Sequence, residues 1–212
     1  FKDTFFSRNL NINCRGNLLD LSSPVAMGII NITPDSFYDG GKYVDLPEIE
    51  KRVDQIIEEG ASIIDFGGFS SRPGAKFVSE EEEWQRLSPA LELAREKYPD
   101  AIFSVDTFRV SIAEKAYKQY NIDIINDISG GESDPAMFDF IAETNIPYII
   151  MHMQGTPFQM EKHPVYDDVV DDLLTFFSLK TQKLLNKGVK DIIIDPGFGF
   201  GKTMEQNYRL LS

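Results

Sequence analysis

The chain has 212 residues, 42% of them hydrophobic, which is enough for one domain with a substantial core. Its 34 Asp and Glu residues outnumber its 21 Lys and Arg residues and give a formal net charge of −13. So acidic a surface repels nucleic acid and anionic membranes, and we expect neither as a partner. Cys14 is the only cysteine and no apolar run reaches the ~18 residues of a membrane helix, so we expect a reduced, cytoplasmic protein.

The first 22 residues differ in pattern from the rest of the chain. Residues 4–21 alternate loosely around Cys14-Arg15-Gly16-Asn17, which predicts a β-hairpin. Residues 23–212 then alternate between short apolar runs and amphipathic segments. The apolar runs predict six buried parallel strands at 25–32, 62–66, 101–105, 122–125, 147–151 and 191–194.

Amphipathic helices are expected between these strands. Residues 47–59 form one apolar stripe that ends at Gly60, and Ser79 with Glu82 predicts a capping box at the start of the next helix. A further helix is expected to start at Asp134-Pro135, and the longest spans 167–187. The result is a single domain with an unbroken βα alternation.

Two parallel architectures fit this alternation, an open doubly wound sheet and a (β/α)8 TIM barrel. The first strand is followed by Asn31-Ile32-Thr33-Pro34-Asp35 and not by a G-x-G-x-x-G fingerprint, which favours the barrel, with the N-terminal hairpin as its floor. A barrel needs eight strands and typically ~250 residues. Because only about six βα units are present, we expect the sequence to be incomplete and a protein that ends at Ser212 to be inactive.

Polar side chains follow each predicted strand. In parallel βα folds the carboxyl ends of the strands form the active-site face, so these residues are expected to meet there. Each has an ordinary structural explanation on its own, such as a helix cap for an Asp or a packed rim position for the His. The set is harder to explain by stability. Its members are Asn31, Asp65, Asp106, Asn126, His152 and Asp195.

Carboxylates and carboxamides arranged in this way suit a flat heterocycle that is rich in N–H donors, because Asp accepts and Asn both donates and accepts. Apolar walls for the ring would come from Ile128, Met151 and Phe200. The sequence contains no Ser-His-Asp, Cys-His or zinc-site pattern. Residues 197–203 lack the spacer of a Walker A loop, so a phosphate loop is rejected.

Two glycine-rich loops, 33–42 and 67–76, mix charged, hydroxyl and aromatic residues and are expected to close over a ligand. In the second loop Arg72 lies between Ser71 and Pro73, where a guanidinium can meet phosphate or carboxylate.

These motifs resemble the dihydropteroate synthase family from about Val25 to the last residue. The two most specific segments are 28–41, which contains Asn-Ile-Thr-Pro-Asp-Ser-Phe, and 65–74, which contains Ser-Arg-Pro-Gly. Weaker matches occur at 104–107, 125–128, 151–153 and 195–200.

The resemblance implies a pterin-binding barrel that joins 6-hydroxymethyl-7,8-dihydropterin diphosphate to p-aminobenzoate with loss of diphosphate, and we expect a homodimer. It implies Asp39 and Arg72 as catalytic residues in closing loops, and Asn31 as the ligand of Mg²⁺ and diphosphate. The residues implied in pterin binding are Asp106, Asn126, Asp195, Ile128 and Met151, and those implied in p-aminobenzoate binding are Phe37, Ser71, Pro73 and Phe200.

The sequence departs from the family pattern at Phe69 and Ser71, where Glu and Thr are more usual, although Ser71 keeps the hydroxyl. The family's lysine after strand seven and Arg/His pair after strand eight have no counterparts among the 212 residues; Lys202 matches a different family position. Two alternatives stay open: a pterin-binding methyltransferase-type barrel, which would lack the two specific loops, and a catalytically silent homologue.

Overall fold

The structure is a computed structural model that describes residues 10–33, 38–39, 43–70, 77–156, 159–160 and 165–212. Six parallel strands form one curved sheet in the order β12-β9-β8-β7-β6-β3. Their bounds are β3 Met27–Asn31, β6 Ile63–Gly67, β7 Ile102–Asp106, β8 Ile124–Asp127, β9 Tyr148–Met151 and β12 Ile192–Asp195. The expected six strands are therefore confirmed.

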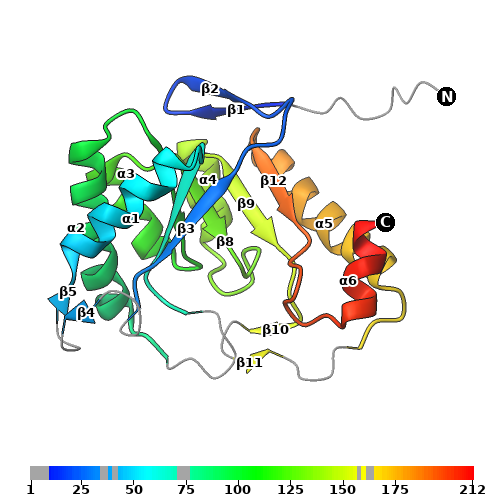
Figure 1. Cartoon of the computed structure of the whole chain (residues 1–212). Helices are drawn as coiled ribbons and strands as arrows, with labels where there is room; N and C mark the ends of the chain where they lie inside the picture. Colours follow the sequence, from blue (N-terminus) through cyan, green and yellow to red (C-terminus); the bar gives the residue numbers. More distant parts are fainter. Residues whose placement is uncertain (1–9, 34–37, 40–42, 71–76, 157–158, 161–164) are drawn as a thin grey trace.

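Helices connect the strands and cover the outer face of the sheet (Figure 1). They are α1 Leu46–Glu58, α2 Glu80–Lys97, α3 Val110–Tyr120, α4 Met137–Thr144, α5 Val169–Asn186 and α6 Met204–Leu211. Asp45, Ser79 and Asp168 cap the starts of α1, α2 and α5 with side-chain oxygens, which satisfies backbone N–H groups in the first turn.

Two details of the helix predictions were wrong. Ser79 caps α2 as expected, but the Glu82 carboxylate accepts a hydrogen bond from Arg86, so no reciprocal capping box forms. The helix expected at Asp134-Pro135 begins later, at Met137, because Asp134 Oδ1 accepts from the Ala136 N–H in a turn that precedes the helix.

The strands alternate between an outer and an inner face. Along β6, Ile64 and Phe66 belong to the large core between sheet and helices, whereas Ile63 belongs to a smaller cluster inside the curve of the sheet. Gly28 allows α1 to approach closely, since a Cβ there would lie 2.3 Å from Cγ2 of Ile56. With side chains alternating in this way, Asp65 and Asp106 are on the inner face.

The N-terminal hairpin is confirmed as β1 Asn11–Cys14 paired with β2 Asn17–Asp20, while residues 4–9 of the predicted hairpin lie outside the described part. Ile12 and Cys14 pack against inner residues of the sheet, including Ile63. Arg15 donates to Asp123 Oδ1 across 2.5 Å, which attaches the turn to the sheet. The hairpin lies at one end of the sheet, and the loops lie at the other (Figure 1).

Two short antiparallel ladders lie at that loop end, β4 Tyr38–Asp39 with β5 Tyr43–Val44 and β10 Gly155–Thr156 with β11 Gln159–Met160. The sequence predicts only loops here, because a two-residue ladder has no recognisable period.

The outermost strands of the sheet are β3 and β12. Within the described residues each pairs along one side only. Ile29 on β3 is 57% exposed and Ile194 on β12 is 50% exposed, which contrasts with the buried strands between them. As for membranes, the described part of the chain has no helix whose length and hydropathy would let it cross a bilayer.

Candidate functional site

Polar residues from neighbouring strands lie side by side at the carboxyl ends of the sheet. In the strand register Asn31 is beside Gly67, Gly67 is beside Asp106, and Asp106 is beside Asn126. The structure therefore brings together three of the residues expected at the site. The fourth strand end, Asp195 on β12, is in register with Met151 on β9.

Gly67 provides the space between two of these side chains. A Cβ on Gly67 would lie 2.7 Å from Asn31 Oδ1 and 3.6 Å from Asp106 Oδ2. The amide of Asn31 and the carboxylate of Asp106 thus both reach over the Gly67 backbone. The sequence predicts Gly67 only as the first residue of the loop 67–76, whereas the structure places it at the end of β6, where it contributes to the site by having no side chain.

Two carboxylates at this end of the sheet have oxygens that are removed from solvent. Asp65 is 3% exposed, and its Oδ2 accepts a hydrogen bond from Asn126 Nδ2 over 3.0 Å. Asp106 is half-buried as a residue, but its Oδ1 is fully buried. Within the described part of the chain, neither this Oδ1 nor Asp65 Oδ1 has a hydrogen-bond partner.

Their electrostatic environment disfavours charge. Burial raises the pKa of Asp65 above its usual value, against the opposing effects of the Ser104 hydroxyl and then of the Asn126 amide. Burial also raises the pKa of Asp106, well above its usual value, and the negative charges of Asp65, Glu83 and Asp127 add to the effect. Buried carboxylate oxygens without donors are rare in proteins and are found more often at functional sites than elsewhere. A ligand edge with several N–H groups would satisfy them.

An apolar cluster forms a second wall of the site. Ile128 and Met151, which are 5% and 3% exposed, belong to the same cluster, and Phe200 packs against it. These are the three residues expected from sequence to flank a ring. Sequence reasoning missed Phe69 and Phe108 of this cluster, whose rings meet edge to face with centroids 5.1 Å apart.

The loop after β12 is held in a fixed shape next to Asp195. The Gly197 N–H donates to Asp195 Oδ1 over 2.8 Å, and Gly197 has a φ of +68°. A Cβ there would lie 2.2 Å from the carbonyl oxygen of His152, so this position requires glycine.

The buried side chain of Lys202 donates hydrogen bonds to backbone carbonyl groups of this loop and of its neighbour after β9. Its Nζ donates to the carbonyl oxygens of His152, Gly197 and Phe200 at 3.0, 3.0 and 3.1 Å, and the residue is 9% exposed. Burial lowers the pKa of Lys202 to about 8. All three ammonium donors are bonded to backbone, so Lys202 fixes the loops after β9 and β12 relative to each other.

His152 was wrongly included in the polar ring. It follows Met151, and because Met151 faces the inner cluster, the next side chain faces the helices. The His152 ring lies 4.9 Å from the Phe176 ring of α5, centroid to centroid. Burial and the nearby Lys202 charge lower the pKa of His152 to about 4, so at neutral pH it is an uncharged packing residue.

Several expected site residues are not described. Phe37, Ser71, Arg72 and Pro73 lie outside the described residues. Asp39 belongs to β4, but its side chain also lies outside them. Their assigned roles therefore stay predictions.

The described residues include no group of three or more His, Cys, Asp and Glu side chains that could enclose a metal ion. A magnesium ion does not require one, since it usually keeps several waters and binds one or two protein oxygens together with substrate phosphates. Asn31 is exposed at the end of β3 and offers one carboxamide oxygen beside Asp106 Oδ2. This donor set fits a magnesium ion that is bound mainly by a diphosphate.

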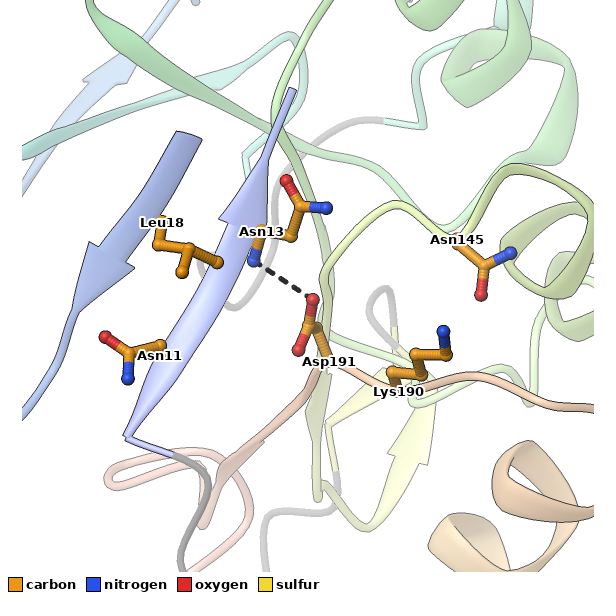
Figure 2. A pocket seen from close by; sticks show the side chains of 6 residues that line it. All are labelled: Asn11, Asn13, Leu18, Asn145, Lys190 and Asp191. Atoms are coloured by element: carbon orange, nitrogen blue, oxygen red, sulfur yellow. Dashed lines mark hydrogen bonds between the residues drawn. The ribbon is translucent and has the colours of Figure 1, made fainter. Parts of the chain in front are cut away.

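A separate hollow of about 520 Å³ opens at the opposite end of the sheet, between the hairpin and the segment that leads into β12. Figure 2 shows its lining and the hydrogen bond from the Asn13 N–H to Asp191 Oδ2. None of the expected site residues contributes to it.

Comparison with known proteins supports the resemblance inferred from the motifs. Residues 27–212 match the family described as pterin binding enzyme. The chain is 41% identical to the dihydropteroate synthase of Haemophilus influenzae over 204 residues, which cover 95% of this chain and 73% of the relative.

Solved structures agree. The Xanthomonas albilineans dihydropteroate synthase with 4-aminobenzoic acid superposes with a TM-score of 0.83 at 36% identity, covering 95% of this chain and 71% of that one. The same enzyme in complex with 7,8-dihydropteroate gives 0.77 at 33% identity, with the same coverage. The chain therefore belongs to the pterin-binding enzyme family and, within it, to the dihydropteroate synthases.

Proposed function

We propose that the mouth formed by Asn31, Asp106, Asn126 and Asp195 binds the dihydropterin substrate of a dihydropteroate synthase. The observation that supports this most strongly is the buried Oδ1 of Asp106, which lacks a donor among the described residues, in a residue that pairs with Asn126 in the strand register. The amino-pyrimidinone edge of a pterin presents several adjacent N–H donors, which suit a carboxylate with free acceptor capacity. Ile128 and Met151 would contact the faces of the ring.

The reaction assigned to this site joins 6-hydroxymethyl-7,8-dihydropterin diphosphate to p-aminobenzoate. The bond between the pterin methylene carbon and the diphosphate oxygen breaks, and its electron pair leaves with diphosphate. The aniline nitrogen then donates its lone pair to the methylene carbon and loses a proton to solvent. Asp106, Asn126 and Asp195 orient the pterin, and the acceptor oxygens of these side chains favour the cation that forms when diphosphate leaves.

The diphosphate end needs positive charge. Magnesium, when bound, would neutralise the leaving group, with Asn31 as its protein ligand. Arg72 and Asp39 are proposed to act in the adjoining loops, and Arg72 would meet charge that is complete only as diphosphate departs. Phe200, with Phe37, Ser71 and Pro73, is proposed to contact p-aminobenzoate, and the X. albilineans relative with bound 4-aminobenzoic acid supports this substrate class.

A cytoplasmic homodimer is the expected working form. The single cysteine, which cannot form an internal disulfide, supports the cytoplasmic location. Size-exclusion chromatography with light scattering measures the mass of the particle in solution. The mass of a monomer would contradict the expected homodimer.

The function is tested by incubating the natural protein with the dihydropterin diphosphate and p-aminobenzoate and following diphosphate and 7,8-dihydropteroate together. We expect both products in equal amounts, in a reaction that stops when EDTA removes magnesium. Tight pterin binding without either product would favour the catalytically silent homologue. Methyl transfer from a methylated folate would favour the methyltransferase-type barrel.

A further inference from the structure

A buried charged cluster lies behind the proposed pterin site, on the side of α2. Glu83 of α2 is 0% exposed although it belongs to the acidic run 80–83, whose other members face solvent. Its Oε1 accepts from the Thr107 hydroxyl over 2.7 Å, and its Oε2 accepts from Arg109 Nη1. Glu83 therefore joins α2 to the connection between β7 and α3.

Such a cluster is costly in free energy. Burial raises the pKa of Glu83, and only the bonds from Thr107 and Arg109 favour its charged form. A buried ion pair is often no more stabilising than well-packed apolar residues of the same volume. Stability alone is therefore a weak explanation for a carboxylate at this position of an amphipathic helix.

The first partner of Glu83 is attached directly to the site. Thr107 follows Asp106, and its N–H donates to the Asn126 carbonyl oxygen over 2.9 Å. Its side-chain oxygen also accepts from the Arg109 N–H over 3.2 Å. Thr107 thus has its backbone bonded to β8 and its hydroxyl bonded to Glu83. Any shift of the Glu83 carboxylate is transmitted to the end of β7, where the Asp106 side chain begins.

The second partner fixes another segment near the site. Arg109 Nη2 donates to the Val78 carbonyl oxygen over 2.7 Å, just before α2 begins. At the other end of the same connection, a Cβ on Gly68 would lie 3.0 Å from Glu83 Cγ. The carbonyl oxygen of Gly68 accepts from Arg86 Nη1 over 2.9 Å. Gly68 and Val78 lie at the two described ends of the β6–α2 connection. Gly68 contacts Glu83 and Arg86 in the first turns of α2, and Val78 is bonded to Arg109, the partner of Glu83.

We propose that Glu83 is a positioning residue for the pterin site, which fixes Asp106 through the Thr107 hydroxyl. This inference rests on the proposed pterin-binding function. Glu83 does not touch the substrate in this account. It determines where the Asp106 carboxylate lies relative to the Asn126 amide, and hence whether both can meet the same edge of the ring.

The test compares three single variants, the double variant Glu83→Gln/Thr107→Val and a control by calorimetric titration with 6-hydroxymethyl-7,8-dihydropterin diphosphate, well below the unfolding temperature of each. Glu83→Gln keeps the size of the side chain but loses the charge that pairs with Arg109. Thr107→Val keeps the shape and removes the hydroxyl, whereas Thr107→Ser keeps the hydroxyl. Asp100→Asn, on an exposed residue at the opposite end of β7, is the control for a general change of charge.

We expect Glu83→Gln and Thr107→Val to weaken pterin binding by roughly tenfold to a hundredfold, the usual size of the effect when a binding group is displaced by about 1 Å. Thr107→Ser and Asp100→Asn should bind within about twofold of the wild type, a change near the limit of such a measurement. The double variant should be no weaker than the worse single variant, because both changes break one connection.

Several results would overturn the proposal. Wild-type affinity in folded Glu83→Gln and Thr107→Val, with only their melting temperatures lowered, would show that the cluster is purely structural. Additive losses in the double variant would show that Glu83 does not act through Thr107. If Glu83→Gln does not fold, the comparison of Thr107→Val with Thr107→Ser decides. A wild-type protein that binds no pterin would overturn the proposed function itself. That result differs from the ones above, in which the wild type binds pterin and only the role of Glu83 is rejected.

Discussion

Asn126 donates a hydrogen bond from its Nδ2 to Oδ2 of Asp65 over 3.0 Å, from a position next to Asp106 in the strand register. Because Asp65 Oδ2 is the acceptor, the NH2 end of the Asn126 amide faces inward. The Asn126 oxygen and its second N–H direction are then left for a ligand. The carboxyl group of Asp65 therefore orients Asn126, a residue that we propose as a pterin ligand.

The raised pKa of Asp106 predicts a conflict between stability and binding. A carboxyl whose folded pKa lies above its unfolded pKa opposes folding at neutral pH, and this cost disappears as the pH falls below its folded pKa. Asp106→Asn removes the charge and should raise the melting temperature at pH 7, by roughly 2–4 °C for each kcal/mol relieved. It should also abolish pterin binding. Thermal scans at pH 7 and calorimetry check the two effects, and a lower melting temperature would contradict the assigned direction of the pKa shift.

The sequence predicts correctly that Asn31, Asp106 and Asp195 lie at the ends of parallel strands. Recognising where each apolar run stops is enough to place these three residues. The prediction for His152 is wrong because successive side chains of a strand point to opposite faces of the sheet. A difference of one residue in the strand end therefore places this side chain against the helices and not in the polar ring. The sequence prediction also fails at Glu83, since four consecutive glutamates resemble a solvated helix start. Only the packing of α2 against Gly68 shows which of them is buried. Gly67 is visible in the sequence as the start of a glycine-rich loop, but its position between the Asn31 and Asp106 side chains depends on the strand register.

Gly67→Ala is predicted to affect the diphosphate end selectively. Its Cβ would lie 2.7 Å from Asn31 Oδ1, whose amide can rotate away, and at an ordinary contact distance of 3.6 Å from Asp106 Oδ2. The variant should therefore keep its affinity for 6-hydroxymethyl-dihydropterin and lose affinity for the diphosphate form in the presence of magnesium. Calorimetry with both ligands checks this.

A matched control for that variant is Gly188→Ala, at the end of α5, where a Cβ meets nothing within 4 Å but φ is +88°. It should lower stability through backbone strain and leave both affinities unchanged. Equal losses for the two ligands in Gly67→Ala would contradict the assignment of Asn31 to the diphosphate.

The protein should lose stability in acid partly through His152. Its folded pKa is about 4 against a usual value of 6.5, so between these pH values the unfolded chain binds a proton that the folded protein does not. The stability contribution is complete above pH 6.5 and decreases as the pH falls to about 4. Over the interval from pH 6.5 to 5 the expected loss is about 1.6 kcal/mol, less than the full 1.36 kcal/mol for each pH unit because the unfolded histidine is only half protonated at pH 6.5.

Urea unfolding of the wild type and of His152→Gln at pH 8, 6.5 and 5 measures this contribution. The variant should lose less stability than the wild type between pH 6.5 and 5, whatever its stability at pH 8. Parallel losses in the two proteins would show that His152 is protonated in the folded state near its usual pKa.

The most direct test of the account is the affinity of Asp195→Ala for the dihydropterin. Asp195 precedes Pro196, which favours an extended backbone at the end of β12, next to Met151 in the sheet. Calorimetric titration of the wild type, Asp195→Ala and the control Asp100→Asn should show binding in the first and last and none in the Asp195 variant. Circular dichroism should show that all three are folded. Unchanged affinity in folded Asp195→Ala would contradict the assignment of this strand end to the pterin site.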